Sequence, residues 1–167
     1  MSWDNAHAFC EWLTKKEIVT GKIKAGQKYR LPTDSEWSVA VGLDQEKGGT
    51  PQEKSRGIKD VYPWGKEWPP PKGAGNYEKG YKVDVFDYTS PVGRFASNQF
   101  GIFDMGGNVW EWCEDLYNPS TNKTLVLRGA CWDNGNVRDF HLSSHRSYDV
   151  PQYKDLTIGF RCVLSSE

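Results

Sequence analysis

The chain has 167 residues, a formal net charge of −1, eight tryptophans and four cysteines. This length suits a single domain, taken here as residues 1–167, with a sizeable hydrophobic core. The near-neutral charge gives no electrostatic reason to expect nucleic acid as a partner. No apolar stretch approaches the roughly 20 residues that span a bilayer, so we expect no membrane insertion.

Two helices are expected near the N-terminus. Ser2 is a good N-cap residue for the first helix, and the apolar residues after it keep helical spacing: Trp3, Ala6, Cys10 and Leu13. Thr33 and Glu36 form a capping box at the start of the second helix. The inner face of that helix is expected to carry Trp37, Ala40 and Val41.

The rest of the chain is expected to be poor in regular secondary structure. Residues 44–82 are polar and rich in Gly, Pro and Lys. Because Tyr62, Trp64 and Trp68 are embedded in them, we expect a long ordered loop rather than a linker. Short strands are expected near residues 109–112, 125–129, 140–146 and 158–163. The predicted class is therefore α+β with little regular secondary structure.

A glycine-rich run at residues 101–113 carries three oxygen-bearing side chains, Asp104, Asn108 and Glu111. Glycines let the backbone turn sharply, so that its carbonyl groups can point inward. Carboxylate, amide and carbonyl oxygens suit calcium, which takes six to eight oxygen ligands in flexible geometry. The alternative is a glycine-rich turn that leads into a buried aromatic strand.

Four motifs in order along the chain resemble the formylglycine-generating enzyme family, also called the sulfatase-modifying-factor domain. They are residues 29–37 (YRLPTDSEW), 101–113 (GIFDMGGNVWEWC), 127–132 (LRGACW) and 158–162 (IGFRC). The resemblance runs from Ser2 to Leu164 and lacks the family's N-terminal strands. It implies a variant of the C-type-lectin-like fold.

The resemblance also implies a copper site that this chain does not reproduce. The family enzyme oxidises a substrate cysteine to formylglycine with copper held by two cysteines, and those positions correspond to Arg138 and Ser143. An arginine cannot ligate copper, and a thiolate pair is needed to hold Cu(I). We therefore expect no copper and no formylglycine-generating activity.

Calcium ligands, by contrast, are all present at the positions that the resemblance implies. The first set is Asn76, Tyr77, Asp84 and Phe86, and the second is Asp104, Gly107, Val109 and Glu111. Every one of these residues offers a side-chain or backbone oxygen. Two structural calcium ions are the expected cofactors.

The four cysteines show no Cys-x-x-Cys spacing of a redox or zinc site. Cys10 and Cys162 are placed like a disulfide found in some members of the family. If they are oxidised, a compartment outside the cytoplasm is expected; no signal peptide is visible in this chain. Cys113 and Cys131 are expected to be small buried residues.

The expected function is a catalytically degenerate domain of this family that binds a small molecule, a glycan or a protein. The residues expected to contact the ligand are Trp132, Asn134, Arg138, His141, His145 and Tyr148. The alternative is an enzyme with altered chemistry, a hydrolase or a metal-dependent oxidoreductase. On a strand, His141, Ser143 and His145 would share one face, where they could bind a metal or activate the hydroxyl.

Overall fold

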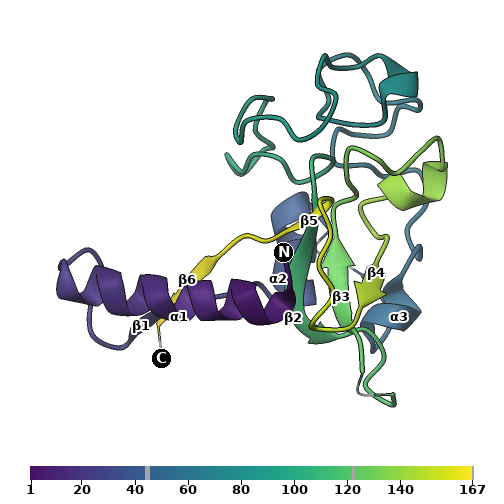
Figure 1. The fold of residues 1–167 in the computed structure, drawn as a ribbon. Helices are drawn as coiled ribbons and strands as arrows, with labels where there is room; N and C mark the ends of the chain where they lie inside the picture. The colour runs from purple at the N-terminus through teal and green to yellow at the C-terminus, as the bar shows by residue number, and fades with distance from the viewer. Residues whose placement is uncertain (44–45, 122, 167) are drawn as a thin grey trace.

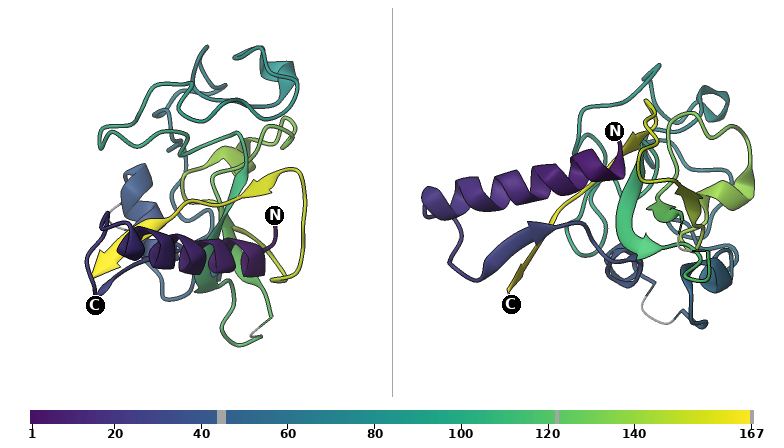
Figure 2. Two further views of the ribbon diagram at one scale, coloured as in Figure 1. Left: turned by 60° about the vertical axis from the view of Figure 1, so that its left-hand side comes forward. Right: turned by 60° about the horizontal axis from the view of Figure 1, so that its bottom comes forward.

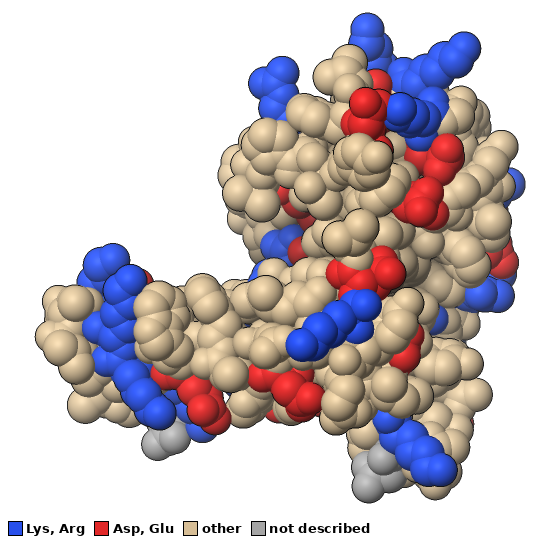
Figure 3. All heavy atoms as spheres, viewed as in Figure 1, with Lys and Arg blue, Asp and Glu red and all other residues tan. Residues whose placement is uncertain are grey.

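The computed structural model describes residues 1–43, 46–121 and 123–166. An arm projects from the body of the molecule, made by helix α1 (Trp3–Val19) and a two-stranded antiparallel sheet of β1 (Gln27–Arg30) and β6 (Val163–Ser166) (Figures 1 and 2). In the space-filling view the same arm stands clear of the body (Figure 3). The N-terminal helix and the C-terminal strand therefore both belong to this arm.

Helix α1 confirms the first predicted helix. The Ser2 hydroxyl accepts a hydrogen bond from the Asn5 backbone N–H at 3.2 Å, so Ser2 is its N-cap. Ala6 and Cys10 are buried, and the N-terminal amine of Met1 donates to the Ile158 carbonyl at 2.9 Å. The start of the helix is thereby fixed against the C-terminal part of the chain.

Helix α2 (Asp34–Val41) begins at the predicted capping box. Thr33 accepts a hydrogen bond from the Glu36 backbone N–H at 3.1 Å, and the Glu36 carboxylate accepts one from the Thr33 N–H at 2.8 Å. Gly42 ends the helix at φ 99°, a left-handed conformation that favours glycine. The predicted start of this helix is confirmed.

A four-stranded sheet in the order β4-β3-β2-β5 lies at the centre of the body. Its strands are β2 (Trp110–Leu116), β3 (Leu125–Arg128), β4 (Ser147–Asp149) and β5 (Ile158–Gly159). Strand β2 pairs antiparallel with β3 and parallel with β5. The strands expected near 109–112 and 125–129 are confirmed, whereas the one expected at 158–163 divides into β5 and β6 around residues 160–162.

The strand expected at residues 140–146 is wrong. A short 3₁₀ helix, η2 (Arg138–His141), occupies its beginning, and the chain then turns before β4. The backbone N–H groups of Ser143 and His145 bond to Val61 and Leu142 rather than to a neighbouring strand. Without strand alternation, His141, Ser143 and His145 do not share one face.

The long loop is more structured than its composition suggests. It contains helix α3 (Pro51–Lys54), which begins at a second capping box formed by Thr50 and Glu53, and the 3₁₀ helix η1 (Lys79–Tyr81). Its predicted aromatic anchors hold it in place: the rings of Tyr62 and Trp64 stack 4.9 Å apart at an angle of 5°. The loop is ordered, as expected, because its aromatic residues pack together.

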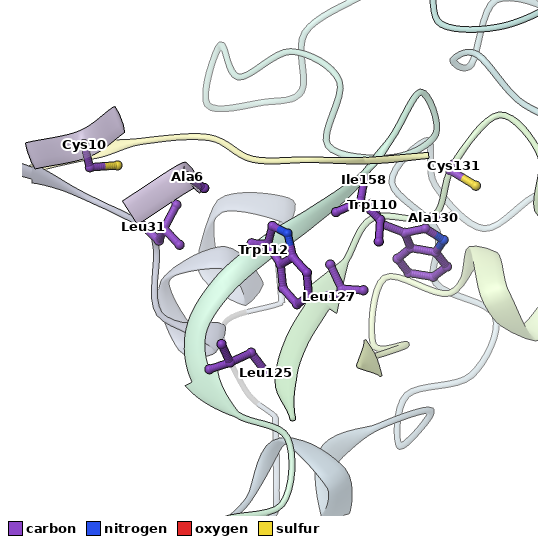
Figure 4. Packing of buried hydrophobic residues seen from close by; sticks show 10 residues of the cluster. All are labelled: Ala6, Cys10, Leu31, Trp110, Trp112, Leu125, Leu127, Ala130, Cys131 and Ile158. Carbon is purple, nitrogen blue, oxygen red and sulfur yellow. The ribbon is translucent and has the colours of Figure 1, made fainter. Parts of the chain in front are cut away.

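The main core cluster joins α1 to the central sheet (Figure 4). Its buried members are Ala6, Cys10, Leu31, Trp110, Trp112, Leu125, Leu127, Ala130, Cys131 and Ile158. Trp112 is fully buried, and its indole N–H donates to the Met1 carbonyl at 3.0 Å. The fold has few helices and strands, and large aromatic side chains supply much of the apolar surface that it buries.

Cys10 and Cys162 lie side by side with their sulfur atoms 3.4 Å apart, both as free thiols. We predict that mild oxidation links them and that mass spectrometry of unreduced protein recovers a Cys10–Cys162 peptide pair. The bridge closes a very long loop, and such a bridge restricts the unfolded chain strongly, by about 2–4 kcal/mol. Recovery of Cys10 linked to Cys113 instead would contradict the packing of α1.

Within the part of the chain that the structure describes, no helix is both long enough and apolar enough to cross a bilayer.

Candidate functional site

His141 lies in an aromatic cluster and not in an open cleft. Its ring centroid is 5.3 Å from Tyr77, 5.4 Å from Trp68 and 5.5 Å from Tyr81. Nδ1 donates to the Val137 carbonyl at 3.0 Å, while Nε2 is buried without a partner among the described residues. Burial lowers the pKa of His141, so the imidazole is neutral near pH 7.

His145 occupies a different environment beside strand β2. Its ring packs 5.6 Å from Trp110 and 5.2 Å from Phe140, and its Nδ1 accepts a hydrogen bond from Arg56 Nε at 3.1 Å. Burial, followed by the charges of Arg56, Arg128 and Arg146, lowers the pKa of His145 to about 3. This imidazole is therefore a neutral hydrogen-bond acceptor for an arginine.

Ser143 is not activated by either histidine. Its hydroxyl is buried and has no hydrogen-bond partner among the described residues, and its carbonyl accepts from Arg128 at 2.9 Å. A nucleophilic serine needs a base within hydrogen-bond reach. Within residues 1–43, 46–121 and 123–166, no three His, Cys, Asp or Glu side chains are grouped to hold a metal ion. The geometry gives the hydrolase alternative no support.

The copper positions implied by the family are occupied by groups that do not fit the ion. Arg138 lies on the surface, where its guanidinium donates to the Tyr62 hydroxyl at 2.6 Å and to Asp60 at 2.7 Å. Ser143, as described above, is a buried hydroxyl. A guanidinium carries only donors, so these two residues form no copper site.

The remaining thiols, Cys113 and Cys131, cannot share an ion. Glu111 pairs with Arg128 in the β2–β3 register, and the Trp132 N–H donates to the Asn108 carbonyl. Cys113 and Cys131 also belong to different clusters of the hydrophobic core, Cys113 with Trp37 and Cys131 with Trp110. Burial raises the pKa of Cys131 to about 11 and that of Cys113 well above its usual value. Both are small buried residues.

The residues expected to contact a ligand do not converge on one surface. Trp132 lines a pocket of about 200 Å³ with Tyr77 and Tyr88, whereas His145 and Tyr148 line a separate groove. Asn134 accepts a hydrogen bond from the Cys131 N–H and so closes a turn. The expected ligand-contact residues are separated because η2 and the turn after it orient their side chains differently.

The first set of calcium ligands is brought together by Asp84. Its carboxylate accepts hydrogen bonds from the N–H groups of Tyr77, at 3.0 Å, and Phe86, at 2.9 Å. Asn76 is buried beside them, and its amide nitrogen donates to the Tyr88 carbonyl at 2.7 Å. Its amide oxygen has no partner among the described residues. A buried amide oxygen left without a donor is suited to bind a cation.

The second set lines a single hollow of about 550 Å³. Asp104, Gly107, Val109 and Glu111 all contribute to its wall. Gly107 has φ +76°, and a Cβ there would lie 2.4 Å from the Asn76 carbonyl oxygen, so only glycine fits this turn. Gly107 of the second set therefore packs directly against Asn76 of the first set.

The second hollow already holds a cation, Arg161 from the closing motif. Its guanidinium donates to both oxygens of Glu111, at 2.6 and 2.7 Å, and to the Asp104 carbonyl at 3.1 Å. Trp37 donates a further hydrogen bond to Glu111 at 2.8 Å. This pairing was not anticipated from the sequence, and it occupies the carboxylate that the second expected calcium site would need.

A buried ionic network lies at the start of α2, and its partners were not anticipated from the sequence. Arg128 and Arg146, both nearly inaccessible, converge on Asp34 at the start of α2. Arg146 also pairs with Glu46, and the Ser38 hydroxyl accepts from both arginines, at 3.1 and 3.0 Å. Lys54 also lies 4.0 Å from Asp34, so three positive charges face two carboxylates in this network.

The architecture is mixed α+β, with few helices and two small sheets joined by long irregular segments. The chain matches the model of the sulfatase-modifying factor enzyme 1-like domain over residues 1–166. It therefore belongs to the formylglycine-generating enzyme family, and its fold is the family's variant of the C-type-lectin-like fold.

Similar proteins include both inactive and active members by name. The chain is 32% identical, over 99% of its length, to inactive C-alpha-formylglycine-generating enzyme 2 of Mus musculus, of which it covers 48%. It is also 32% identical to the formylglycine-generating enzyme of Thermomonospora curvata, with 98% of this chain and 54% of that protein covered. The chain thus spans about half the length of these relatives.

Among solved structures, PvdO from Pseudomonas aeruginosa superposes with a TM-score of 0.67 at 22% identity. The match covers 100% of this chain and 60% of PvdO. At this level of identity the likeness concerns the fold alone.

Proposed function

We propose that this chain is a catalytically degenerate member of the family that works as a calcium-stabilised binding module. One observation carries the proposal: the two positions that correspond to the family's copper cysteines hold Arg138, whose guanidinium pairs with Asp60 on the surface, and Ser143, a buried hydroxyl. Cys10 and Cys162 pair with each other on the arm, and Cys113 and Cys131 are buried apart. The similarity to a relative named as inactive supports the same reading.

The direct test is conversion of a peptide that contains Cys-x-Pro-x-Arg, with and without Cu(I). We expect no loss of mass corresponding to aldehyde formation, while the Thermomonospora curvata enzyme under the same conditions serves as the positive control. Arg138 would also place a positive charge beside the ion, costing about 4 kcal/mol at 4 Å in a surface-like dielectric. Copper-dependent turnover that disappears in Cys131→Ser would overturn the proposal.

Calcium is proposed as the stabilising ion, chiefly at the first set of ligands. The unpaired Asn76 amide oxygen and the Asp84 carboxylate would supply two side-chain ligands there, and Asp84 already holds the backbone N–H groups of Tyr77 and Phe86. In a fold with short strands, an ion of this kind would hold loops that hydrogen bonds do not. At the second set the ion would have to share Glu111 with Arg161.

We predict that chelation lowers the melting temperature. At a hundredfold excess over its dissociation constant, one ion adds about 2.7 kcal/mol to the free energy of unfolding. The measurement is the difference in melting temperature between calcium and chelator, compared for wild type, Asp84→Asn and Glu111→Gln. Because both side chains also make hydrogen bonds, only this difference isolates the ion, and we expect Asp84→Asn to reduce it more. An identical melting curve in chelator would contradict calcium binding.

A further inference from the structure

A groove between helix α3 and strand β4 has features that the proposed function leaves unexplained. It has a volume of about 460 Å³, and its wall includes Arg56, Tyr117, Phe140, His145 and Tyr148. The groove lies on the opposite side of η2 from the aromatic cluster around His141, since Phe140 and His145 face it while His141 does not line it. Its chemistry is that of two arginines and several aromatic rings.

The groove carries an uncompensated positive charge. None of its lining residues is acidic, and the charge of Arg146 is neutralised from behind by Asp34 and Glu46. Arg56, in contrast, has no carboxylate within ion-pair distance in the described ranges 1–43, 46–121 and 123–166. Its Nε donates to His145, and neither of its terminal nitrogens has an acceptor among those residues. Two parallel donors therefore remain open to an anion.

The backbone and side chain of Arg56 are held in position by contacts with neighbouring residues. Its backbone has φ +60°, an uncommon conformation for a residue with a Cβ, and its N–H donates to the Ser144 carbonyl at 3.0 Å. The guanidinium carbon lies 5.9 Å from the centroid of the Phe140 ring. His145 stays neutral and so remains an acceptor for Arg56 Nε. Backbone strain of this kind is commonly retained at binding sites.

An exposed aromatic face stands beside the free guanidinium. Tyr148 stacks on Tyr117 with ring centroids 4.2 Å apart at an angle of 25°, and Tyr148 is still 51% exposed. The stack fixes the orientation of the ring and leaves part of it open to the groove. A planar apolar group could pack there at little entropic cost, because the ring is already ordered.

We propose that this groove binds an oxyanion carried on a planar apolar body, with Arg56 paired to the oxyanion and Tyr148 packed against the body. The inference deepens the proposed binding function and rests on it by naming the ligand class. A carboxylate, a phosphate or a sulfate would offer the same pair of acceptors to the guanidinium fork. The experiment distinguishes these three sources.

The test is titration of the full chain with benzoate, phenyl phosphate and phenyl sulfate, followed by ligand-observed NMR, with neutral benzamide as the uncharged comparison. At least one aryl anion is expected to bind, benzamide to bind at least about tenfold more weakly, and binding to weaken with added salt. Absence of binding by all three anions at millimolar concentration, or equal binding of benzamide, would overturn the proposal.

Matched variants locate the site. Arg56→Gln should weaken binding about tenfold or more, whereas Arg94→Gln removes the same charge from an exposed loop residue outside the groove and should leave binding unchanged. Tyr148→Ala should weaken binding, and Tyr153→Ala, also exposed, should not. Equal losses in Arg56→Gln and Arg94→Gln would mean non-specific attraction and would refute the site.

The two proposals fail separately. A chain that binds none of the aryl anions and makes no formylglycine remains a degenerate module whose ligand lies elsewhere. A chain that makes formylglycine with copper refutes the degenerate module, and the effect of Arg56→Gln on anion binding still decides whether the groove is a site.

Discussion

Asp34→Ala is expected to lower the free energy of unfolding by about 4 kcal/mol or more. Asp34 is 1% exposed and receives hydrogen bonds from Arg128 and from Arg146, the latter at 3.0 and 2.9 Å. Removing one member of a buried ion pair typically costs 3–5 kcal/mol because the partner charge stays buried without compensation. Here two guanidinium groups would lose their shared partner.

The pKa of Asp34 agrees with this role. Burial by itself would raise it, but the charges and hydrogen bonds of Arg128 and Arg146 outweigh burial and hold the pKa below its ordinary value. The carboxylate is therefore ionised in the folded protein. Its stabilising contribution is present above the unfolded-state pKa and is lost as the pH falls through the lower folded-state pKa.

Chemical denaturation of Asp34→Ala against wild type measures this loss. Asp139→Ala is the matched control, because Asp139 pairs with Lys59 at 3.7 Å on the surface, with both side chains about half exposed. An exposed pair of this kind contributes about 0–1 kcal/mol. If Asp34→Ala cost no more than Asp139→Ala, the buried network would not hold the fold together.

The second large effect is a loss of stability in mild acid, beginning well above the range in which carboxylates titrate. His145 has its pKa lowered to about 3 by burial and by three guanidinium groups, and burial also lowers the pKa of His141. In the unfolded chain both imidazoles regain an ordinary pKa of about 6.5. Between about pH 6.5 and pH 3 the unfolded state therefore binds protons that the folded state does not.

The sign of the effect follows directly from proton linkage. Where the unfolded state binds more protons, stability increases with pH, so acidification destabilises the protein. Between pH 7 and pH 5.5, His145 alone should remove about 1 kcal/mol from the free energy of unfolding, and His141 should add to the loss. The loss should continue as the pH falls further.

Denaturant unfolding at pH 7 and at pH 5.5 tests this, because the pKa values of Asp34 and Glu46 are lowered. Burial raises the pKa of Glu114, and a raised carboxyl pKa stabilises the folded state on acidification, so Glu114 cannot cause a loss. His145→Gln should remove about half of the pH dependence, whatever it does to stability at pH 7. His7→Gln is the matched control for the substitution, because the side chain of His7 is 39% exposed on α1 rather than buried. Equal stability at both pH values would contradict the buried, neutral imidazoles.

The elements that the sequence determined by itself depend on short-range interactions. Ser2 and the Thr33–Glu36 pair satisfy the free N–H groups of their own helices, and Gly42 ends the second helix within one turn. Thr50 and Glu53 form the same kind of capping box, so the start of α3 could have been predicted from the sequence, although it was not. The four ordered motifs likewise identified the family, and with it the fold.

The tertiary structure alone decided how residues 138–149 fold and which side chains they bring together. A strand was expected at residues 140–146, but the N–H groups of Ser143 and His145 donate to the carbonyl groups of Val61 and Leu142 instead. The chain therefore forms η2 and a turn, and His141 and His145 enter different surroundings.

The long-range ion pairs also could not be predicted from the sequence. Asp34 and Arg146 are separated by 112 residues, and Glu111 and Arg161 by 50, so no local pattern links them. Arg56 became notable only because no carboxylate was found beside it. Charges pair according to where the whole chain places them, and a buried charge must find a partner wherever the fold allows. Tertiary packing decides which charged residues pair, and the sequence shows only which charged residues are present.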